Sequence, residues 1–271
     1  MKIFNKIFTK DPIDIYAKAI QDTDIPSYIP VEINNVEEEY LNRWLNNYKN
    51  IAPYSRLLRY YLSTITLNLT KNDRLLDIGS GDNIYYSIMK NYVGACFAND
   101  FNLDTDQNSE YSLEGNIFEL PLPEGNFSKI VLGHSFEHFR YDQDIQLLSL
   151  FKKLLSPGGI CCIEPIFIGQ KYLEVFGHQS KEHYDKSSQK VVTKSSGFPG
   201  SRKKNMGFAR IYSPESLFQR IIKNCMAMGM KCKVISFKMK NQYPPDMNKY
   251  QYKRKSINYP IRHLTITNTR N

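Results

Sequence analysis

Hydrophobic residues between positions 73 and 163 fall in short apolar runs that alternate with segments of helical spacing. The apolar runs, bounded by glycine or polar residues, predict buried strands at 75–78, 93–99, 128–133 and 160–163. The clearest helix is predicted at 142–155, where apolar residues recur every three or four positions before Pro157-Gly158-Gly159 ends it. Strands that alternate with helices form a parallel sheet with right-handed crossovers, so the sequence predicts an α/β fold.

Both flanks of this region carry further predicted elements. Residues 1–70 are predicted to be mostly helical, with apolar residues at helical spacing in 36–48 and 54–67. After Ser213-Pro214, a favourable helix start, a helix is predicted to about residue 228. Closing strands are predicted at 231–239 and 262–269.

The resulting organisation is a helical N-terminal cap over 1–70 and an α/β domain over 71–271. Two long segments interrupt the domain, at about 167–208 and 241–260. The first follows the strand at 160–163, at the sheet edge where open α/β folds bind ligands, so we interpret it as a lid.

Composition narrows the class of protein. A hydrophobic content of 41% supports a packed core and argues against wholesale disorder. The five cysteines form no Cys-x-x-Cys pair, which favours reduced thiols over a disulfide framework or a zinc site. No apolar stretch is long enough to cross a bilayer, and the N-terminus lacks a long apolar signal core, so we expect a cytoplasmic protein.

The net charge of +9 is unevenly distributed. Residues 169–206 hold eight Lys/Arg against three Asp/Glu, a net +5, and residues 238–271 hold eight against one, a net +7. The rest of the chain must therefore be slightly acidic. Since the positive charge lies in the additions to the central domain, those additions are expected to contact something anionic.

A glycine turn follows the first strand of the domain. Gly79-Ser80-Gly81 separates the strand at 75–78 from a helix-like segment, and glycines there allow a ligand to approach the backbone closely. About twenty residues later the next strand ends at Asp100, where Rossmann-type folds bind a ribose diol. A dinucleotide-binding motif would require glycine at position 84, which is Ile84.

Further motifs follow in a fixed order: Asn116-Ile117 before Leu120-Pro121-Leu122-Pro123, then Glu137-His138, then Leu154-Leu155-Ser156-Pro157-Gly158-Gly159. With the glycine turn, this series resembles the class I S-adenosylmethionine-dependent methyltransferases, in particular their type 11 branch. The resemblance covers roughly residues 70–166, and 209–236 more loosely. It implies a Rossmann-like, mostly parallel seven-stranded sheet with flanking helices, a helical N-terminal extension and a lid insertion after the fifth strand.

The resemblance also implies a cofactor, S-adenosylmethionine, with S-adenosylhomocysteine as the product. The implied cofactor-binding residues are Asp77, Gly79, Ser80, Gly81, Asp100, Phe101, Asn116, Ile117 and His134. Two positions depart from the family pattern: Asn83 replaces a glycine and Asn116 an aspartate. Asparagine tolerates left-handed backbone angles, and its amide oxygen can still accept from adenine, so cofactor binding remains the favoured interpretation.

Methyl transfer to a hydroxyl requires alignment of the acceptor and removal of a proton. The candidate bases are His134, His178 and His183. In the resembling family the Glu137-His138 pair mostly orders the start of a helix. His134, His138 and Glu137 could suggest a metal, but no clear further ligand accompanies them, so no metal is expected.

The acceptor is expected to be an anionic small molecule, such as a nucleotide-linked or phosphorylated sugar or another phosphate-bearing intermediate of bacterial surface-glycan (capsule) biosynthesis. The candidate substrate residues are Tyr172, Tyr184, Arg202, Lys203 and Arg210. Alternatives are a quinone or lipid methyltransferase, an RNA methyltransferase, or a non-catalytic methyltransferase-like binding domain. Nucleic acid is disfavoured because no RNA-binding module pattern accompanies the basic, tyrosine-rich loop at 242–259, which could also form a homodimer contact.

Overall fold

The computed structural model describes residues 28–33, 44, 46–48, 50–52, 54–103, 111–177, 180–192, 207–239 and 261–270. Its strands in the main sheet are β1 (Tyr28–Ile33), β2 (Arg74–Ile78), β3 (Ala95–Asp100), β4 (Ser112–Glu114), β5 (Phe127–Gly133), β6 (Leu155–Glu164), β10 (Met230–Met239) and β11 (Ile261–Asn268). Its helices are α4 (Tyr54–Leu67), α5 (Ile84–Met89), α6 (Gln143–Leu154), α7 (Pro214–Leu217) and α8 (Lys223–Ala227), with a short 3₁₀ turn, η1, at Phe136–His138. None of the described helices is long and apolar enough to span a membrane.

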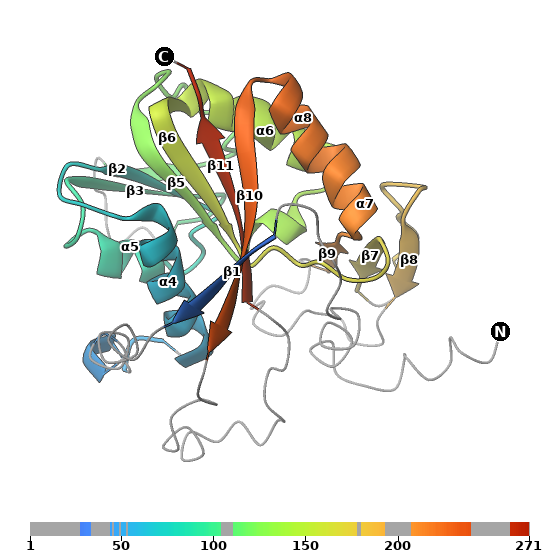
Figure 1. Ribbon diagram of the computed structural model, residues 1–271, viewed down its shortest axis with the longest axis horizontal. Helices are drawn as coiled ribbons and strands as arrows, with labels where there is room; N and C mark the ends of the chain where they lie inside the picture. Colours follow the sequence, from blue (N-terminus) through green and yellow to red (C-terminus); the bar gives the residue numbers. More distant parts are fainter. Residues whose placement is uncertain are drawn as a thin grey trace.

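The main sheet runs in the order β1-β10-β11-β6-β5-β2-β3-β4 (Figure 1). The strands from β6 to β4 are mutually parallel, whereas β11 is antiparallel to both β6 and β10. The predicted mostly parallel seven-stranded sheet with flanking helices is confirmed. Because the parallel strands share one direction, their carboxyl ends meet along a single edge.

An eighth strand, β1, comes from the segment for which the sequence predicted helices. It pairs in parallel with β10 at the edge of the sheet, with Tyr28 opposite Val234. Pro30 lies within it and cannot donate a ladder hydrogen bond, which an edge strand tolerates. That proline also weakens the strand pattern in the sequence. The predicted helix at 54–67 is confirmed as α4, while 36–48 lies outside the described residues apart from helical residues 44 and 46–48.

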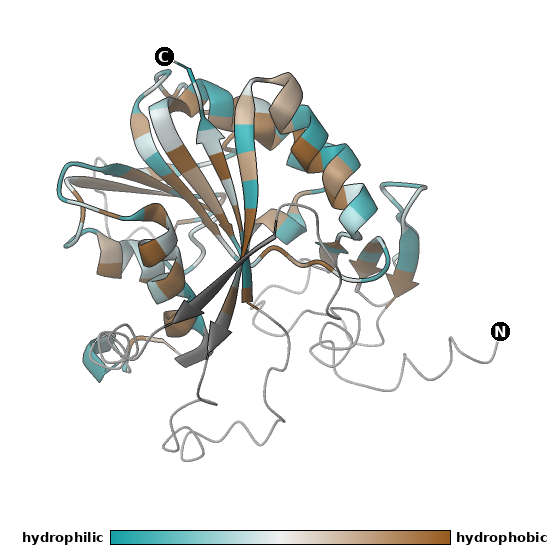
Figure 2. Cartoon of the chain, viewed as in Figure 1, coloured by the Kyte–Doolittle hydropathy of each residue, from teal (hydrophilic) through white to brown (hydrophobic). Residues whose placement is uncertain are grey.

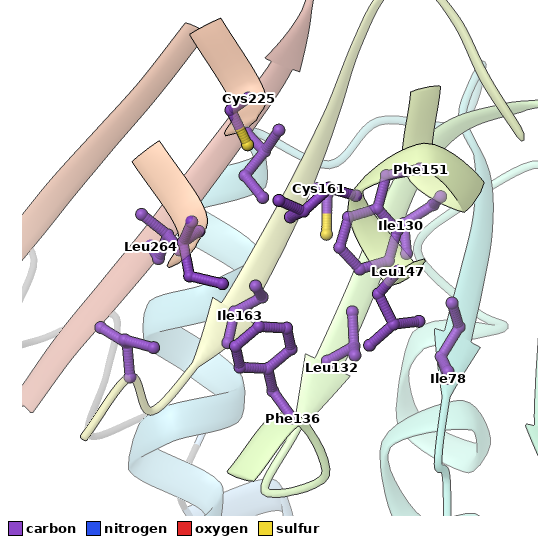
Figure 3. Close-up of a cluster of buried hydrophobic side chains, with 14 of the residues drawn as sticks. Ile78, Ile130, Leu132, Phe136, Leu147, Phe151, Cys161, Ile163, Cys225 and Leu264 are labelled. Atoms are coloured by element: carbon purple, nitrogen blue, oxygen red, sulfur yellow. The ribbon is translucent and has the colours of Figure 1, made fainter. Parts of the chain in front are cut away.

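Alternate residues of each central strand pack on opposite faces of the sheet. Leu76 and Cys161 face α6, α7 and α8, while Leu75 and Cys162 face α4 and α5. The first face is drawn in Figure 3, where Phe151 of α6 lies beside Ile130 and Cys161. In Figure 2 the exposed turns of the helices are largely hydrophilic and the strands between them more hydrophobic. Burial on both faces explains why these strands are nearly continuous apolar runs in the sequence.

The helix after Ser213 begins with the predicted cap. The Ser213 hydroxyl accepts a hydrogen bond from the Ser216 amide at 3.1 Å, and the Ser216 hydroxyl accepts one from the Ser213 amide at 2.8 Å. Pro214 occupies the first turn, where its missing amide leaves no bond unmade. A π-helical turn at Phe218–Ile222 joins α7 to α8, so the helical path runs from Pro214 to Ala227.

The insertion after β6 forms a second, three-stranded sheet in the order β8-β7-β9. Its strands are β7 (Leu173–Phe176), β8 (Gln189–Val192) and β9 (Phe208–Ile211). A small apolar cluster that includes Val175, Val191 and Ala209 supports it. Figure 1 shows this sheet beneath α7, on the side of the main sheet opposite α4. The predicted insertion is therefore a folded unit over its described residues.

A buried ion-pair network joins this small sheet to the main domain. Arg210 of β9 is 1% exposed and contacts Asp144 of α6 at 2.8 Å and Glu174 of β7 at 3.0 Å. Arg220, on the π-helical turn, contacts Asp144 at 2.7 Å and Asp185 of the insertion at 2.8 Å. Two guanidinium groups thus join five chain segments: β9, the π-helical turn, α6, β7 and the part of the insertion that carries Asp185.

Replacing Arg210 with alanine should lower the free energy of unfolding by about 3–5 kcal/mol, because Glu174 would keep a buried charge without its cation and Asp144 would retain only Arg220. Urea unfolding followed by circular dichroism measures this. Lys181→Ala, at an exposed position of the same insertion, is the control and should change stability by less than about 0.5 kcal/mol. A loss below about 1 kcal/mol for Arg210→Ala would contradict the structural role of the network.

Candidate active site

The glycine turn lies at the carboxyl end of β2 and is held by backbone hydrogen bonds to β3. The amides of Gly79 and Ser80 both donate to the Asn99 carbonyl, at 2.8 and 2.9 Å. Gly79 has a φ of 73°, and a Cβ placed there would lie 2.5 Å from the Ser135 Cβ. Glycine is therefore required at position 79 both by the backbone angle and by the contact.

Asn83 replaces the family's third glycine and has a left-handed backbone, with a φ of 57°. It is the residue before α5, and its side-chain oxygen accepts a hydrogen bond from the Ser80 hydroxyl at 2.8 Å. Gly81 is also left-handed, with a φ of 61°, but a Cβ there would meet no atom within 4 Å. Asparagine, like glycine, tolerates this left-handed region, so the turn forms with Asn83 at this position.

Asp100, at the end of β3, lies against the glycine turn. Its Oδ2 accepts a hydrogen bond from the Gly81 amide at 2.8 Å. Asn99, which sequence reasoning did not single out, donates from its side chain to the carbonyls of Leu113 at 2.7 Å and Gly115 at 3.1 Å. Phe101 follows with 64% of its surface exposed, an unusual position for a large apolar ring.

Asp77 is buried beneath the turn, with 2% of its surface exposed. Within the described part of the chain, its Oδ2 accepts no hydrogen bond. Burial, followed by the charges of Asp100 and Asp82, raises the pKa of Asp77 to about 8. A buried carboxyl oxygen without a donor is unfavourable, which points to a bound donor group at this position.

Asn116 begins a turn after β4. Its side-chain amide donates to Glu119 at 2.6 Å, and its side-chain oxygen accepts from the Phe118 amide at 3.3 Å. The next residue, Ile117, is 3% exposed and belongs to the main core. The Asn116 side chain therefore fixes this turn, and Glu119 is a neighbour that the sequence motif did not indicate.

His134 follows β5 in a left-handed conformation, with a φ of 54°. Its amide donates to the Glu164 carbonyl at 2.7 Å. A guanidinium nitrogen of Arg59, from α4, contacts the ring Nε2, and the ring Nδ1 lies 3.8 Å from Glu137. Burial and the Arg59 charge lower the pKa of His134 to about 4, so its imidazole is neutral at neutral pH.

Glu137 and His138 lie in η1, directly after this strand end. Despite burial, the neighbouring His138 and His134 lower the pKa of Glu137. The His138 Nδ1 lies 2.6 Å from the Phe208 carbonyl of β9, so it donates a hydrogen bond to the small sheet. His138 thereby links the carboxyl edge of the main sheet to the insertion.

Two further polar residues at this edge were missed by sequence reasoning. Glu164 at the end of β6 and His263 on β11 are each 0% exposed, and 3.9 Å separates Glu164 Oε2 from His263 Nε2. Helix α4 covers them with a polar stripe: Thr66 lies 2.9 Å from His263 Nδ1, and Arg59 lies nearby. No local motif marks these positions, because only strand pairing brings β6 and β11 together under α4.

The other candidate base, His183, is engaged within the insertion. Its Nε2 lies 3.1 Å from the Ser188 carbonyl and 3.0 Å from the Ser188 hydroxyl. His178, the remaining candidate, lies outside the described residues. Of the three histidines, the structure therefore places His134 at the carboxyl edge beside the glycine-turn strand.

The described candidate substrate residues belong to the small sheet and its contacts. The Tyr172 hydroxyl donates to Asp185 at 3.0 Å. The Tyr184 ring packs against Phe208, with centroids 5.0 Å apart. Arg210 lies in the ion-pair network, where two carboxylates match its charge. Arg202 and Lys203 lie outside the described residues.

Comparison with known proteins agrees with this geometry. Residues 76–163, which run from β2 to the end of β6, match a family described as a methyltransferase domain. No protein of curated function matches the chain. The matched segment contains the glycine turn, Asp100 and His134, and it forms a methyltransferase domain.

Several solved structures are also similar. The 1,6-didemethyltoxoflavin-N1-methyltransferase of Burkholderia thailandensis, solved with 1,6-didemethyltoxoflavin and S-adenosylhomocysteine, is 12% identical over 92% of this chain and 94% of that one, with a TM-score of 0.47. A SAM-dependent methyltransferase from Archaeoglobus fulgidus is 17% identical over 83% and 98% of the two chains, with a TM-score of 0.46. The YcgJ protein of Bacillus subtilis is 13% identical over 79% and 99%, with a TM-score of 0.45.

The two turn glycines should respond differently to alanine. Gly81→Ala should lower the free energy of unfolding by about 1–2 kcal/mol, the cost of a left-handed alanine with open space around it. Gly79→Ala adds the clash with Ser135 and should cost about 1–3 kcal/mol more. Urea unfolding of both variants measures the difference. Equal losses would contradict the close packing of Gly79 on Ser135.

Proposed function

We propose that the chain is a class I S-adenosylmethionine-dependent methyltransferase that transfers the methyl group to a hydroxyl of an anionic small molecule in the cytoplasm. The acceptor class is a nucleotide-linked or phosphorylated sugar, or another phosphate-bearing intermediate of bacterial surface-glycan (capsule) biosynthesis. The observation that carries the proposal is charge: the insertion at 169–206 has a net +5. Its small sheet is joined to the carboxyl edge of the main sheet through His138. A basic segment beside a reaction centre favours an anionic substrate.

The described residues fit S-adenosylmethionine, and we assign them to its parts. The amides of the Gly79–Gly81 turn and the unpaired carboxyl oxygen of Asp77 suit its methionine end, where an ammonium group would satisfy Asp77. Asp100 would hold the ribose hydroxyls through its other carboxylate oxygen. Asn116 and Ile117 would bind the adenine, and the exposed Phe101 ring would cover the nucleoside.

The bound cofactor supplies a methyl group activated by a positive sulfur, so no metal is needed for the transfer. The protein must exclude water and hold the acceptor in line with that methyl group. Helix α4 helps to enclose the site, to which it contributes Arg56 and Arg59. Arg56 contacts Asp82 of the glycine turn at 2.7 Å, which couples α4 to the cofactor side of the site.

Asp100→Ala should weaken S-adenosylmethionine binding by about 2–3 kcal/mol, or roughly 30- to 150-fold, because charge-assisted hydrogen bonds to the ribose are lost. Isothermal titration calorimetry measures the dissociation constant. Asp82→Ala is the matched control: Asp82 lies in the same turn, but its exposed ion pair with Arg56 is worth at most about 1 kcal/mol. Unchanged affinity in a folded Asp100→Ala protein would reject the ribose assignment.

The acceptor class is tested with a panel of uridine-diphosphate hexoses, hexose phosphates, unphosphorylated hexoses and a short-chain quinone, using labelled S-adenosylmethionine. We expect methylation of a phosphate-bearing sugar. Replacing both Arg202 and Lys203 with alanine should then raise the Michaelis constant of that acceptor roughly 10-fold and reduce its dependence on salt. Cofactor affinity should not change.

Methylation of the quinone with no methylation of any phosphate-bearing sugar would favour the lipid or quinone alternative and contradict the proposal. Failure to bind either S-adenosylmethionine or S-adenosylhomocysteine would instead favour a non-catalytic binding domain. Lys186→Ala with Lys190→Ala is a charge-matched control for the double variant, because it removes two positive charges from another part of the insertion.

A further inference from the structure

Glu164 ends β6 at the carboxyl edge of the sheet, beside the end of β5. Its backbone pairs with Gly133, and a Cβ placed on Gly133 would lie 3.4 Å from Glu164 Oε1. The side chain is 0% exposed, and within the described residues neither carboxyl oxygen has a hydrogen-bond partner. Native proteins seldom leave a buried carboxyl unpaired on both oxygens unless it has a functional partner.

The groups around Glu164 come from every element packed against it. They are Arg56, Arg59 and Tyr60 of α4, Asp77 of β2, Glu137 of η1, Cys162 of β6 and His263 of β11. Burial raises the pKa of Glu164 to about 8, with Arg59 opposing this shift and Glu137 and Asp77 adding to it. A carboxyl with this pKa is a stronger base than an ordinary one and can still ionise near neutral pH.

His134 is less suited to accept a proton from the acceptor. Arg59 carries only hydrogen-bond donors, so the Nε2 that it contacts uses its lone pair as the acceptor. The same Arg59 nitrogen also lies 3.3 Å from Nδ1, which in turn lies 3.8 Å from Glu137. Neither nitrogen offers a lone pair to another molecule, and the pKa lowered to about 4 makes the ring a weak base.

We propose that Glu164 contacts the reactive hydroxyl of the acceptor and takes its proton. This inference rests on the proposed O-methylation. The Glu164 carboxylate accepts the hydroxyl proton while an oxygen lone pair forms the bond to the methyl carbon, and the electrons of the broken carbon–sulfur bond remain on sulfur. Within the described residues neither carboxyl oxygen accepts a hydrogen bond, so we expect the reactive end of the acceptor to carry hydroxyl donors and its anionic group to lie elsewhere. Glu164 is fully buried, with Arg59 and Tyr60 of α4 among its neighbours, so the acceptor reaches it only if side chains around it move.

The location of Glu164 can be tested without knowing the acceptor. Sinefungin resembles S-adenosylhomocysteine but carries an amine where the transferred methyl group would lie. Glu164→Gln should weaken sinefungin binding to the full-length protein by roughly 10- to 100-fold, because a charge-assisted hydrogen bond is lost, and leave S-adenosylhomocysteine binding unchanged. Calorimetry measures both affinities, and retained S-adenosylhomocysteine binding shows that the variant is folded.

Glu137→Gln is the matched control, since Glu137 is the neighbouring buried carboxyl with an unpaired oxygen among the described residues. It should affect the two ligands equally. Equal effects of Glu164→Gln on both ligands, no effect on either, or a sinefungin-specific loss in Glu137→Gln alone would overturn the assignment. Once an acceptor is identified, Glu164→Gln should lower its kcat about 100-fold or more with a smaller change in KM.

Titration of the wild-type protein gives a readout that does not depend on a variant. The ratio of sinefungin to S-adenosylhomocysteine affinity should rise as Glu164 ionises toward pH 8, while Asp77 affects both ligands alike. Because the folded-state pKa of Glu164 is raised, its contribution to stability is present at low pH and lost as pH rises through about 8. In the Glu164→Gln variant, the melting temperature should therefore depend less on pH over this range. The proposal would also be overturned if the affinity ratio did not change with pH and Glu164→Gln left the pH dependence of the melting temperature unchanged.

These results separate the two proposals. A sinefungin-specific loss in Glu164→Gln, with no phosphate-bearing sugar methylated by the wild type, would reject the proposed acceptor class and retain Glu164 at the reaction centre. Methylation of a phosphate-bearing sugar with no sinefungin-specific effect would retain the proposed function and reject Glu164 as the proton acceptor.

Discussion

Close packing of the glycine turn between β3 and the end of β5 is the constraint on which the site depends. Gly79 has no side chain, so Ser135 can lie against it, and the Ser135 hydroxyl donates to the Ile78 carbonyl at 2.7 Å. The Asn99 carbonyl holds the turn from the other side by accepting two amides. These contacts fix the turn, so the Gly81 amide lies within hydrogen-bond distance of Asp100 and helps to position that carboxylate.

Around this turn the fold concentrates charge that an ordinary core would exclude. Asp77, Glu137 and Glu164 are all buried at the carboxyl edge, and each has an oxygen without a hydrogen bond among the described residues. Arg59 enters the same region from α4. Such a cluster destabilises an empty protein and is typical of sites that bind and transform a ligand. The apolar packing of α4 on the sheet, through Leu57, Leu58 and Leu62, offsets that cost.

The insertion shows how a polar sequence can still build an ordered unit. Its own apolar cluster is small, and Arg210 and Arg220 join it to α6 through Asp144. In these ion pairs the insertion supplies the acidic Glu174 and Asp185. The positive charges at Arg202 and Lys203 belong to the same segment and are the ones we assign to the acceptor.

The sequence by itself determined the sheet and the cofactor motifs, because both are local. Apolar runs predicted β2, β5 and β6, helical spacing predicted α4 and α6, and the order of motifs predicted the methyltransferase domain that residues 76–163 match. Asn83 was recognised in advance as a residue that tolerates a left-handed backbone, and its φ of 57° agrees. These properties depend on neighbours within a few residues, which the sequence shows directly.

Only the tertiary structure decided which polar side chains meet. Glu164 and His263 are far apart in the sequence and come together because β11 pairs with β6. The sequence shows Arg59 only as a charged residue of a predicted helix. Its place beside His134 and Glu164 results from the packing of α4 over the carboxyl edge. The sequence analysis gives Arg210 as a candidate substrate residue, but the pairing of β9 with β7 beside α6 buries it in an ion-pair network. Burial and long-range pairing set the charge, pKa and accessibility of a residue, and neither is a property of its local sequence.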